Sequence, residues 1–446
     1  MSRHLLTAAV VCSLLSACGR PAPARSPAAG RAAAPAATAD AQPQSAAGAM
    51  ADDLSVAAPV RHANLTIFPV ISKSLRADDR FITLAEGLRA GTVEIREMGS
   101  TRGVNQPAND PAQVANRGTP DETPQTAADR DEPAAQVAVA SDDKTPDAAG
   151  DDEPSDADVV ELRALLNDVN RLVVINRSDK PLYLMPGEII VGGSQDRTIG
   201  EELVIAPTGE PVPINVFCVE HGRWGARDLA VSTKLYCALH DTDDPEAVAH
   251  KANQGEFVGK AGNLGKSGRV AVQCDKNQQK VWDDVELANR QTQAVSETGA
   301  FTANFVDGRV VERLKPYQAG LERAVSQCER IVGVVVAING KIETVDVFES
   351  TPLFLKLWPA LLKGYAVDAV EASDGDSACQ SNTADEAAAF LASVLRDQES
   401  AAEKTEGGLI VSRHETNDRI SFSAGVSGIG GGMGAAAPVH AAGFAK

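Results

Sequence analysis

The stretch Ile331-Val-Gly-Val-Val-Val-Ala-Ile338, Asn339-Gly340, Lys341-Ile-Glu-Thr-Val-Asp-Val-Phe348 predicts a β-hairpin. Both arms are rich in β-branched residues, which favour strands. Asn339-Gly340 supplies the positive φ angles that a two-residue type I′ turn requires. The two arms should therefore pair antiparallel across a tight turn.

Further short apolar runs, separated by Gly, Pro, Asn and Asp turns, surround this hairpin. Before it, we predict strands at Asn64–Val70, Thr92–Met98, Arg171–Asn176, Pro181–Met185, Glu188–Val191, Leu203–Ile205 and Val212–Val219 and a short helix at Thr83–Arg89. After residue 275 we predict helices at Gln278–Gln293, Gln318–Arg330 and Pro352–Ala372. A capping box at Thr383–Glu386 opens a further predicted helix that ends at about Glu399. The last predicted strands lie near Leu409–Ser412 and Ile420–Ser423. The pattern predicts an α+β fold with an antiparallel, β-rich, sandwich-like core and helices in the C-terminal half.

Long parts of the chain have a composition that cannot build a core. Residues 18–60 are rich in Ala, Pro, Ser and Gly and predict a disordered tether, and residues 424–446 predict a Gly/Ala-rich flexible tail. Residues 101–161 hold fifteen acidic and four basic residues, so this segment supplies −11 of the net charge of −19. We expect one domain over residues 61–423 with a disordered acidic insertion at 101–161. An acidic chain also argues against a nucleic-acid partner.

The first residues read as a bacterial lipoprotein signal peptide covering residues 1–17. Arg3 precedes a short apolar run that ends in Leu15-Ser16-Ala17, and Cys18 follows. The run is too short to span a bilayer. We expect cleavage before Cys18, a lipid with palmitate-type chains on its thiol, and attachment to the cell membrane. Because Gly19 and not Asp follows the cysteine, we expect the periplasmic face of the outer membrane.

Two polar segments, Gln195–Arg197 and Cys218–Trp224, each follow a predicted strand and include glycine nearby. We expect them to lie on adjacent strand ends and to share a cleft. The candidate acid–base groups are Asp196, Glu220 and His221, and the candidate ligand-binding side chains are Gln195, Arg197 and Arg223. Strand alternation would send Glu220 and His221 to opposite sides unless the strand ends within the motif.

Cysteine and histidine spacing leaves two further readings open. Cys218-x2-His221 and Cys237-x2-His240 have a spacing related to zinc sites. An oxidising compartment favours a Cys218–Cys237 disulfide instead. The sequence names no other cofactor, because the common hydrolase, zincin and nucleotide-loop motifs do not occur.

Asp346 and Glu349 flank Phe348 at the end of the hairpin. Such a carboxylate pair can bind a cation or work as acid and base. More often these residues form the solvent-facing side of a strand, and this is our prediction.

Several blocks of the sequence, taken in order, resemble the ARPP domain family, which is associated with ADP-ribosylglycohydrolase and rhodanese/phosphatase proteins. These blocks are Val169–Asn176, Pro181–Glu188, Gln195–Arg197, Pro213–Trp224 and Gly333–Phe348. The resemblance covers roughly residues 64–400. It implies a contextual link to ADP-ribose metabolism and identifies no catalytic residues.

Two functional hypotheses follow from these patterns. The first is a lipid-anchored, non-catalytic binding or structural module of the envelope, with a small-molecule or envelope-protein ligand. The second is an enzyme acting on an ADP-ribose-like or phosphorylated small molecule through the candidate acid–base groups. The lack of a known catalytic motif favours the first hypothesis, and whether the chain is an enzyme stays open at this point.

Overall fold

The structure is a computed structural model that describes residues 52–98, 170–222, 250–251, 255–374, 382–400, 402–406, 408–426 and 438–446. All of them belong to the compact unit Gln44–Lys446. The predicted signal peptide, residues 18–51 of the predicted tether and the acidic insertion lie outside the described residues. The prediction of disorder is wrong for the end of the tether, because Leu54–Val56 and Val60–His62 are strands that pair with Leu65–Ser72. A search of the described helices finds none that is long and apolar enough to cross a membrane.

The hairpin forms as predicted and lies inside the larger of the sheets. Its arms are β13 (Ile331–Ile338) and β14 (Lys341–Phe348), and the turn residues Asn339 and Gly340 have φ angles of 51° and 74°. The strand order in the described part of this sheet is β1-β3-β13-β14-β18-β17-β16-β15, with β2 also paired to β3. The other strands are β1 (Leu54–Val56), β2 (Val60–His62), β3 (Leu65–Ser72), β15 (Ala402–Glu406), β16 (Leu409–Glu415), β17 (Arg419–Gly425) and β18 (Pro438–Ala445).

The flexible tail predicted from residue 424 onward is wrong for residues 438–445. This segment is β18, which pairs antiparallel with β14 on one side and with β17 on the other. Its small residues pack into the sheet interior, and Val439 and Phe444 are buried. We judged the segment by its Gly and Ala content, but small side chains suit a central strand that is covered on both faces.

A second sheet has the order β12-β8-β9-β11-β6-β5. Its strands are β5 (Val93–Glu97), β6 (Arg171–Asn176), β8 (Glu188–Gly192), β9 (Arg197–Ile199), β11 (Pro211–Cys218) and β12 (Phe257–Asn263). Arg96 on β5 forms an isolated antiparallel bridge with Glu256, the residue before β12, and the Glu97 amide donates to the Gly255 carbonyl. The two edges of the sheet therefore meet, which closes it into a small barrel around its apolar cluster.

A short sheet and a helix complete the apolar cluster of the barrel. The sheet has the order β10-β7-β4, with β4 (Ile82–Thr83), β7 (Leu182–Leu184) and β10 (Leu203–Ile205), and β4 and β7 are parallel. Helix α2 (Leu84–Ala90) follows β4 and contributes Leu84 and Leu88 to the cluster. Thr83 and Glu86 form a capping box at its start.

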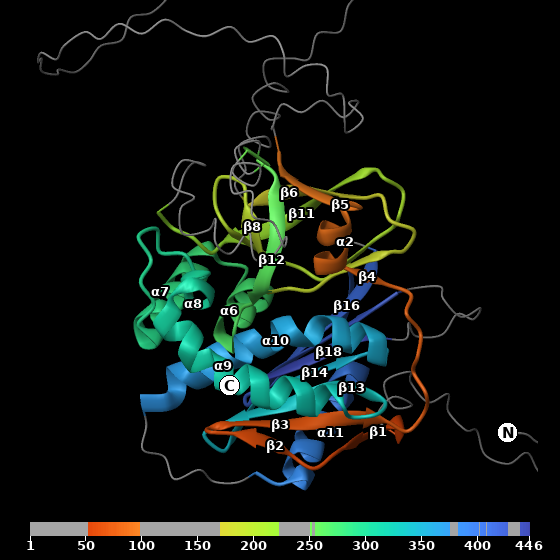
Figure 1. Cartoon of the computed structure of the whole chain (residues 1–446). Helices are drawn as coiled ribbons and strands as arrows, with labels where there is room; N and C mark the ends of the chain where they lie inside the picture. Colours follow the sequence, from red (N-terminus) through yellow and green to blue (C-terminus); the bar gives the residue numbers. More distant parts are fainter. Residues whose placement is uncertain are drawn as a thin grey trace, which may run out of the picture. The chain divides into compact units, whose positions relative to one another are not determined.

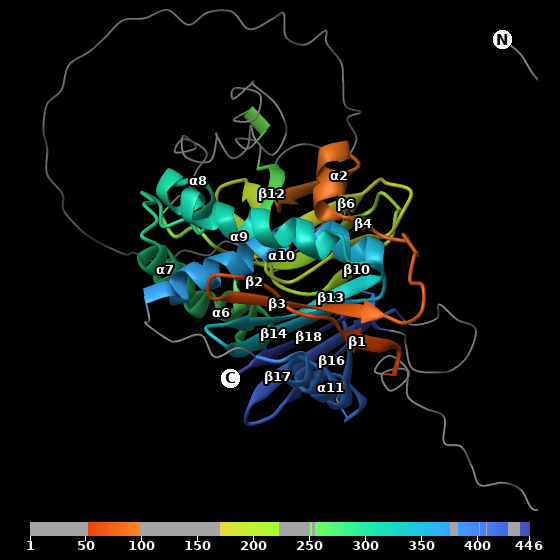
Figure 2. The ribbon, with the colours of Figure 1, turned by 60° about the horizontal axis from the view of Figure 1, so that its bottom comes forward.

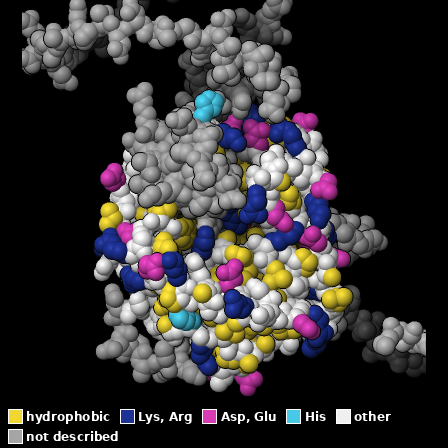
Figure 3. All heavy atoms as spheres, viewed as in Figure 1, with side chains coloured by type: hydrophobic (Ala, Val, Ile, Leu, Met, Phe, Trp, Pro, Cys, Tyr) yellow, Lys and Arg dark blue, Asp and Glu magenta, His cyan; other side chains and the backbone are white. Residues whose placement is uncertain are grey.

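The predicted acidic segment connects neighbouring strands. Residues 93–97 of β5 pair antiparallel with residues 172–176 of β6, so the chain leaves the sheet and returns to the adjacent position. This is the geometry expected of an insertion between two strands of one domain. On the described surface, basic and acidic side chains are interspersed (Figure 3).

The described helices lie in the C-terminal half, apart from α2. They are α6 (Lys266–Val270), the π-helical turn η3 (Ala271–Asp275), α7 (Gln278–Thr292), α8 (Ala303–Val306), α9 (Gly308–Ser326), α10 (Thr351–Glu371), η4 (Ala372–Asp374) and α11 (Ala384–Ser400). Helix α10 packs on β13 of the larger sheet and on β12 of the barrel (Figure 1). The α+β class with antiparallel sheets is confirmed, and the β-rich core contains a helical layer.

The predicted start of one helix is wrong. We predicted a helix that starts at Gln318, but α9 begins at Gly308, where the Asp307 carboxylate accepts from the Arg309 amide. Pro316 lies inside this helix. A continuous buried stripe that includes Leu314 and Leu321 outweighs the hydrogen bond that the proline cannot donate.

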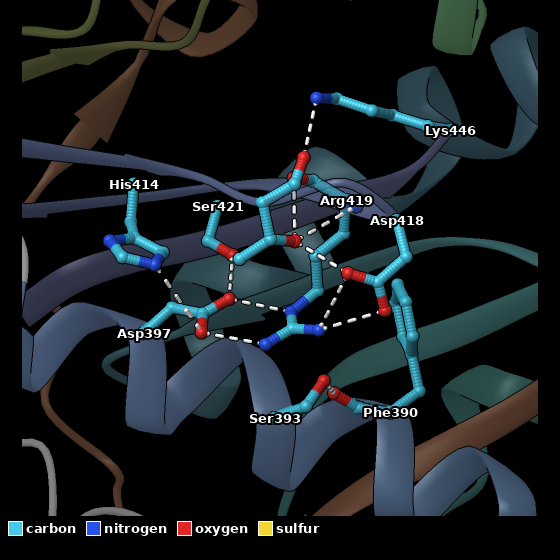
Figure 4. A network of polar contacts seen from close by, with 9 residues as sticks. Phe390, Ser393, Asp397, His414, Asp418, Arg419, Ser421 and Lys446 are labelled. Carbon is cyan, nitrogen blue, oxygen red and sulfur yellow. Dashed lines mark hydrogen bonds and ion pairs between the residues drawn. The ribbon is translucent and has the colours of Figure 1, made fainter.

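Helix α11 covers the other face of the larger sheet (Figure 2). Alternate residues of β13 divide between the two faces, with Val334 in the cluster beneath α10 and Val335 in the cluster beneath α11. Asp397 of α11 accepts two hydrogen bonds from Arg419, at 2.6 and 2.7 Å, and one from Ser421 on the same strand (Figure 4). These polar contacts fix α11 to β17.

Helix α10 approaches the barrel closely because Gly364 has no side chain. A Cβ atom at Gly364 would lie 2.7 Å from the Leu264 carbonyl oxygen and 3.0 Å from the Asn263 carbonyl oxygen. Both of these atoms belong to backbone, which cannot rotate away. The glycine therefore sets the distance between the helical layer and the end of β12.

We expect Gly364→Ala to lower the free energy of unfolding by about 1–3 kcal/mol, because the added methyl group must displace backbone. Urea denaturation of the full chain measures this change. Gly308→Ala is the matched control, since a Cβ at Gly308 meets nothing within 4 Å and alanine favours helix. Equal stability of the Gly364→Ala variant and the unaltered chain would contradict the close approach.

Candidate functional site

A network of ionic and phenolic side chains lies between the larger sheet, the short β10-β7-β4 sheet and helices α6 and α10. Its members are almost fully buried and come from β7, β14, β18, α6, α10 and the turn before β10. They are Tyr183, Glu202, Arg269, Asp346, Tyr365 and His440. The network therefore joins segments that are far apart in the sequence.

Asp346 is the centre of this network. Arg269 donates from both terminal nitrogens, at 2.8 and 2.6 Å, the Tyr365 hydroxyl donates to the same carboxylate, and His440 Nε2 lies 3.0 Å away. Burial alone would raise the pKa of Asp346, but Arg269 and His440 hold it well below its usual range. Our prediction of a solvent-facing Asp346 is wrong, because α6, α10 and β18 cover this end of β14.

His440 connects Asp346 to a second carboxylate. Its Nδ1 lies 3.1 Å from Glu202 Oε1, and the Tyr183 hydroxyl donates to the same oxygen at 2.5 Å. The imidazole ring stacks on Phe348 with 4.4 Å between ring centroids. Burial alone would lower the pKa of His440, but the two carboxylates raise it to about 9. The ring is therefore an imidazolium at neutral pH and donates on both sides.

The side chains of this network bond to one another, so the network has a structural role. Each carboxylate has cationic or phenolic donors of this chain, and the members are shielded from solvent. Glu349, the other acidic residue we had placed on the solvent face, pairs with Arg80. This arrangement ties β18 to the hairpin and to the neighbourhood of β7.

The two polar segments singled out in the sequence lie side by side. Arg197 opens β9 and Cys218 ends β11, and the two residues are direct partners in the antiparallel register. The Asp196 amide donates to the Glu220 carboxylate at 3.0 Å. The adjacency predicted from the strand ends is therefore present, while a shared cleft stays a prediction. Arg223 lies outside the described residues.

The candidate acid–base groups are held in different surroundings. Asp196 accepts from the Thr302 hydroxyl at 2.9 Å, and Glu220 accepts from the Thr298 hydroxyl at 2.6 Å. Both carboxylates are buried, whereas His221 is exposed and packs edge-on against the Trp282 ring. Strand β11 ends at Cys218, within the motif, so strand alternation does not place Glu220 and His221, and the two side chains differ in that only His221 is exposed.

The turn that carries Gln195 is held by backbone and side-chain hydrogen bonds that do not use the Gln195 amide. Ser194 donates from its amide and its hydroxyl to Glu97, at 2.7 and 2.8 Å, and the Gly193 amide donates to the Glu256 carbonyl. Gln195 is fully buried, and neither polar atom of its side chain has a hydrogen-bond partner among the residues that the structure describes. The turn thus holds a buried amide whose donor and acceptor capacity no described residue uses.

Arg197 and Cys218 lie next to this turn. The Arg197 guanidinium is 2 % exposed and lies 4.0 Å from the Glu97 carboxylate. Burial raises the pKa of the Cys218 thiol, and Arg197 opposes this effect. The Gln278 side chain accepts a hydrogen bond from the Cys218 backbone amide and donates one to the Cys218 carbonyl, both at 2.8 Å.

The metal hypothesis stays untested on two of its four residues. Cys237 and His240 lie outside the described residues. The alternative Cys218–Cys237 disulfide therefore stays a prediction as well. Within the described ranges, no group of three or more His, Cys, Asp and Glu side chains is placed to hold a metal ion.

Sequence reasoning missed the residues that support the two polar segments. Thr298, Thr302 and Gln278 contact these segments from positions 60 to 106 residues further along the chain. Only the Gln278 side chain carried a signal, because it opens a predicted helix. Partners at such distances in sequence cannot be paired from periodicity alone.

We expect the free energy of unfolding to fall as pH rises from about 6.5 to about 9. The folded state binds the His440 proton more tightly than the unfolded chain does, so this contribution is complete below the ordinary pKa of 6.5 and is lost as pH passes 9. Its size is on the order of 3 kcal/mol. Urea denaturation across this pH range measures it.

His440→Gln isolates the histidine. Asp284 and Glu371, whose pKa values burial raises to about 7 and 9, also release protons in this range, but they are present in both proteins. The stability difference between the chain and the variant should be largest near pH 6 and should shrink toward pH 9. A difference that does not change with pH would show that the His440 proton contributes nothing.

Comparison with known proteins assigns the chain to a family. The model of the ARG and Rhodanese-Phosphatase-superfamily-associated Protein domain, ARPP-1, matches residues 53–111 and 137–426. The unmatched residues 112–136 lie inside the predicted acidic insertion. No curated protein and no solved structure matches the chain. The family match covers most of the chain and both polar segments, and the chain belongs to the ARPP-1 domain family.

Proposed function

We propose that this protein is a lipid-anchored module of the cell envelope that binds a small polar ligand at the Gln195 turn without transforming it. The Cys18 lipid would attach it to the membrane, on the periplasmic face of the outer membrane. Residues 19–51 would separate the lipid from the first described residue. The ARPP-1 domain would then present its binding turn in the envelope.

The single observation that carries the binding proposal is the Gln195 amide, which has no hydrogen-bond partner among the described residues. Burying an amide without hydrogen bonds costs about 1–3 kcal/mol, so its presence in an otherwise satisfied turn calls for a reason. A ligand group that both donates and accepts, such as a hydroxyl or an amide, would satisfy it. The association of the family with ADP-ribosylglycohydrolases makes ADP-ribose the first compound to test.

The surroundings of the candidate acid–base groups favour binding over catalysis. Asp196 and Glu220 already accept hydrogen bonds from threonine hydroxyls of this chain, and His221 lies on the exposed side. A general acid or base must reach the proton that it transfers. These carboxylates instead fix the turn that holds Gln195.

We expect Gln195→Leu to abolish the stabilisation that a ligand confers on the unaltered chain, while the ligand-free variant keeps its melting temperature or gains a few degrees. The gain would come from removing a buried polar group without partners. A thermal-shift screen with ADP-ribose, sugar phosphates and inorganic phosphate measures both quantities.

Asn176→Leu is the matched control for this experiment. Asn176 is also a fully buried amide, but it donates to the Lys180 and Ile205 carbonyls and accepts from Ser178. Its replacement should lower the melting temperature of the ligand-free chain. A similar loss with Gln195→Leu would indicate a structural role for Gln195, and turnover of ADP-ribose by the unaltered protein would contradict a non-catalytic module.

We expect Cys18→Ala to prevent incorporation of labelled palmitate and to release the protein from the membrane fraction, because the thiol is the proposed lipid acceptor. Cys328→Ala, which changes a described cysteine that forms no disulfide, is the control and should stay with membranes. A Cys18→Ala variant that is still acylated, or that sediments with membranes in high salt, would overturn the anchor.

A further inference from the structure

The turn of the β13–β14 hairpin also caps the end of helix α10. The Asn339 side chain donates from Nδ2 to the Ala372 carbonyl at 2.9 Å. Asn64, the residue before β3, donates to the Ala369 carbonyl at 2.8 Å, and its own carbonyl accepts from the Asn339 backbone amide at 2.9 Å. The last carbonyls of a helix have no partner within it, so these two asparagines supply donors from outside. The hairpin tip and the start of β3 are thereby joined to the end of α10.

The sequence of this turn makes its asparagine chemically reactive. Asn339-Gly340 is the only Asn-Gly pair in the sequence. Both residues are partly exposed to solvent. Gly340 has no side chain to hinder approach to its backbone nitrogen, and within the described residues this amide donates no hydrogen bond. An unhindered backbone nitrogen therefore follows directly after the asparagine side chain.

We propose that Asn339 is a site of spontaneous deamidation, which converts the cap of α10 into a group that opposes the helix end. In this reaction the Gly340 nitrogen loses its proton to solvent and bonds to Asn339 Cγ, and Nδ2 takes up a proton and leaves as ammonia. Water then opens the five-membered ring and returns a proton to the Gly340 nitrogen. The product is aspartate or isoaspartate at this position, and no oxidant or reductant is consumed.

The product cannot replace the contact that Nδ2 makes. A carboxylate has no proton to donate to the Ala372 carbonyl, and a negative charge at the C-terminal end of a helix is unfavourable. Isoaspartate also adds a backbone atom to a two-residue turn whose twist matches that of the strands. Deamidation therefore releases the end of α10 from the hairpin tip, while the contact between Asn64 and Ala369 stays in place.

The experiment compares two turn asparagines within one protein. The full chain is incubated in mildly alkaline buffer, and peptide mass spectrometry follows the aspartate and isoaspartate fraction at each asparagine over time. Asn417, in the turn between β16 and β17, is the internal control, because it is more exposed than Asn339 but is followed by Asp418 instead of glycine. We expect Asn339 to convert several-fold faster than Asn417. Equal or slower conversion at Asn339 would overturn the proposal.

Substitutions test what the modification does to the fold. Asn339→Asp reproduces one product, and Asn339→Gly removes the donor without adding a charge at a position with a φ of 51°. We expect both to lower the melting temperature by a few degrees, Asn339→Asp by more, whereas the matched control Asn417→Asp should leave it nearly unchanged. An Asn339→Asp variant as stable as the unaltered chain would refute the role of the cap. Neither readout uses a ligand, so the outcome is independent of the ligand screen.

Discussion

The buried ion pair between Arg269 and Asp346 is the contact on which the arrangement of the core depends. Both side chains are almost fully buried, and removal of one partner from such a pair costs about 3–5 kcal/mol because the other charge is left without compensation. The guanidinium fork matches the carboxylate at two points, which fixes α6 against β14. With α6 held against β14, Tyr365 on α10 and His440 on β18 also contact the Asp346 carboxylate.

This pair also explains why most ionisable groups of the interior are unsuited to chemistry. A charge removed from water needs donors or acceptors of its own, and in this core Asp346, Glu202 and Glu188 have all found them within the chain. The buried groups that could still interact with a ligand are those for which the fold supplies too few hydrogen-bond or charge partners. The Gln195 amide, by contrast, has no hydrogen-bond partner among the described residues.

The parts of the fold that could be predicted from sequence are those that depend on local chemistry. The Asn339-Gly340 turn and the Thr383 capping box follow from φ preferences and short-range hydrogen bonds, and both formed. The solvent-facing prediction for Asp346 failed because the cover comes from Arg269 and His440, 77 and 94 residues away. The adjacency of the polar segments was predictable, since it needed only two strand ends. The unpartnered state of Gln195 was not, because it depends on what every other nearby group binds.

The position of the acidic insertion has a physical reason in the same terms. Its flanking strands β5 and β6 are already neighbours, so a long connection between them costs only the slowly growing entropy of closing a loop. Glu97 ends β5, and its carboxylate accepts the two hydrogen bonds that hold Ser194 in the Gln195 turn. The chain therefore leaves the barrel next to the turn with the unpartnered amide. A change in the length of this connection would leave the pairing of β5 with β6 and the contacts of Glu97 with Ser194 in place.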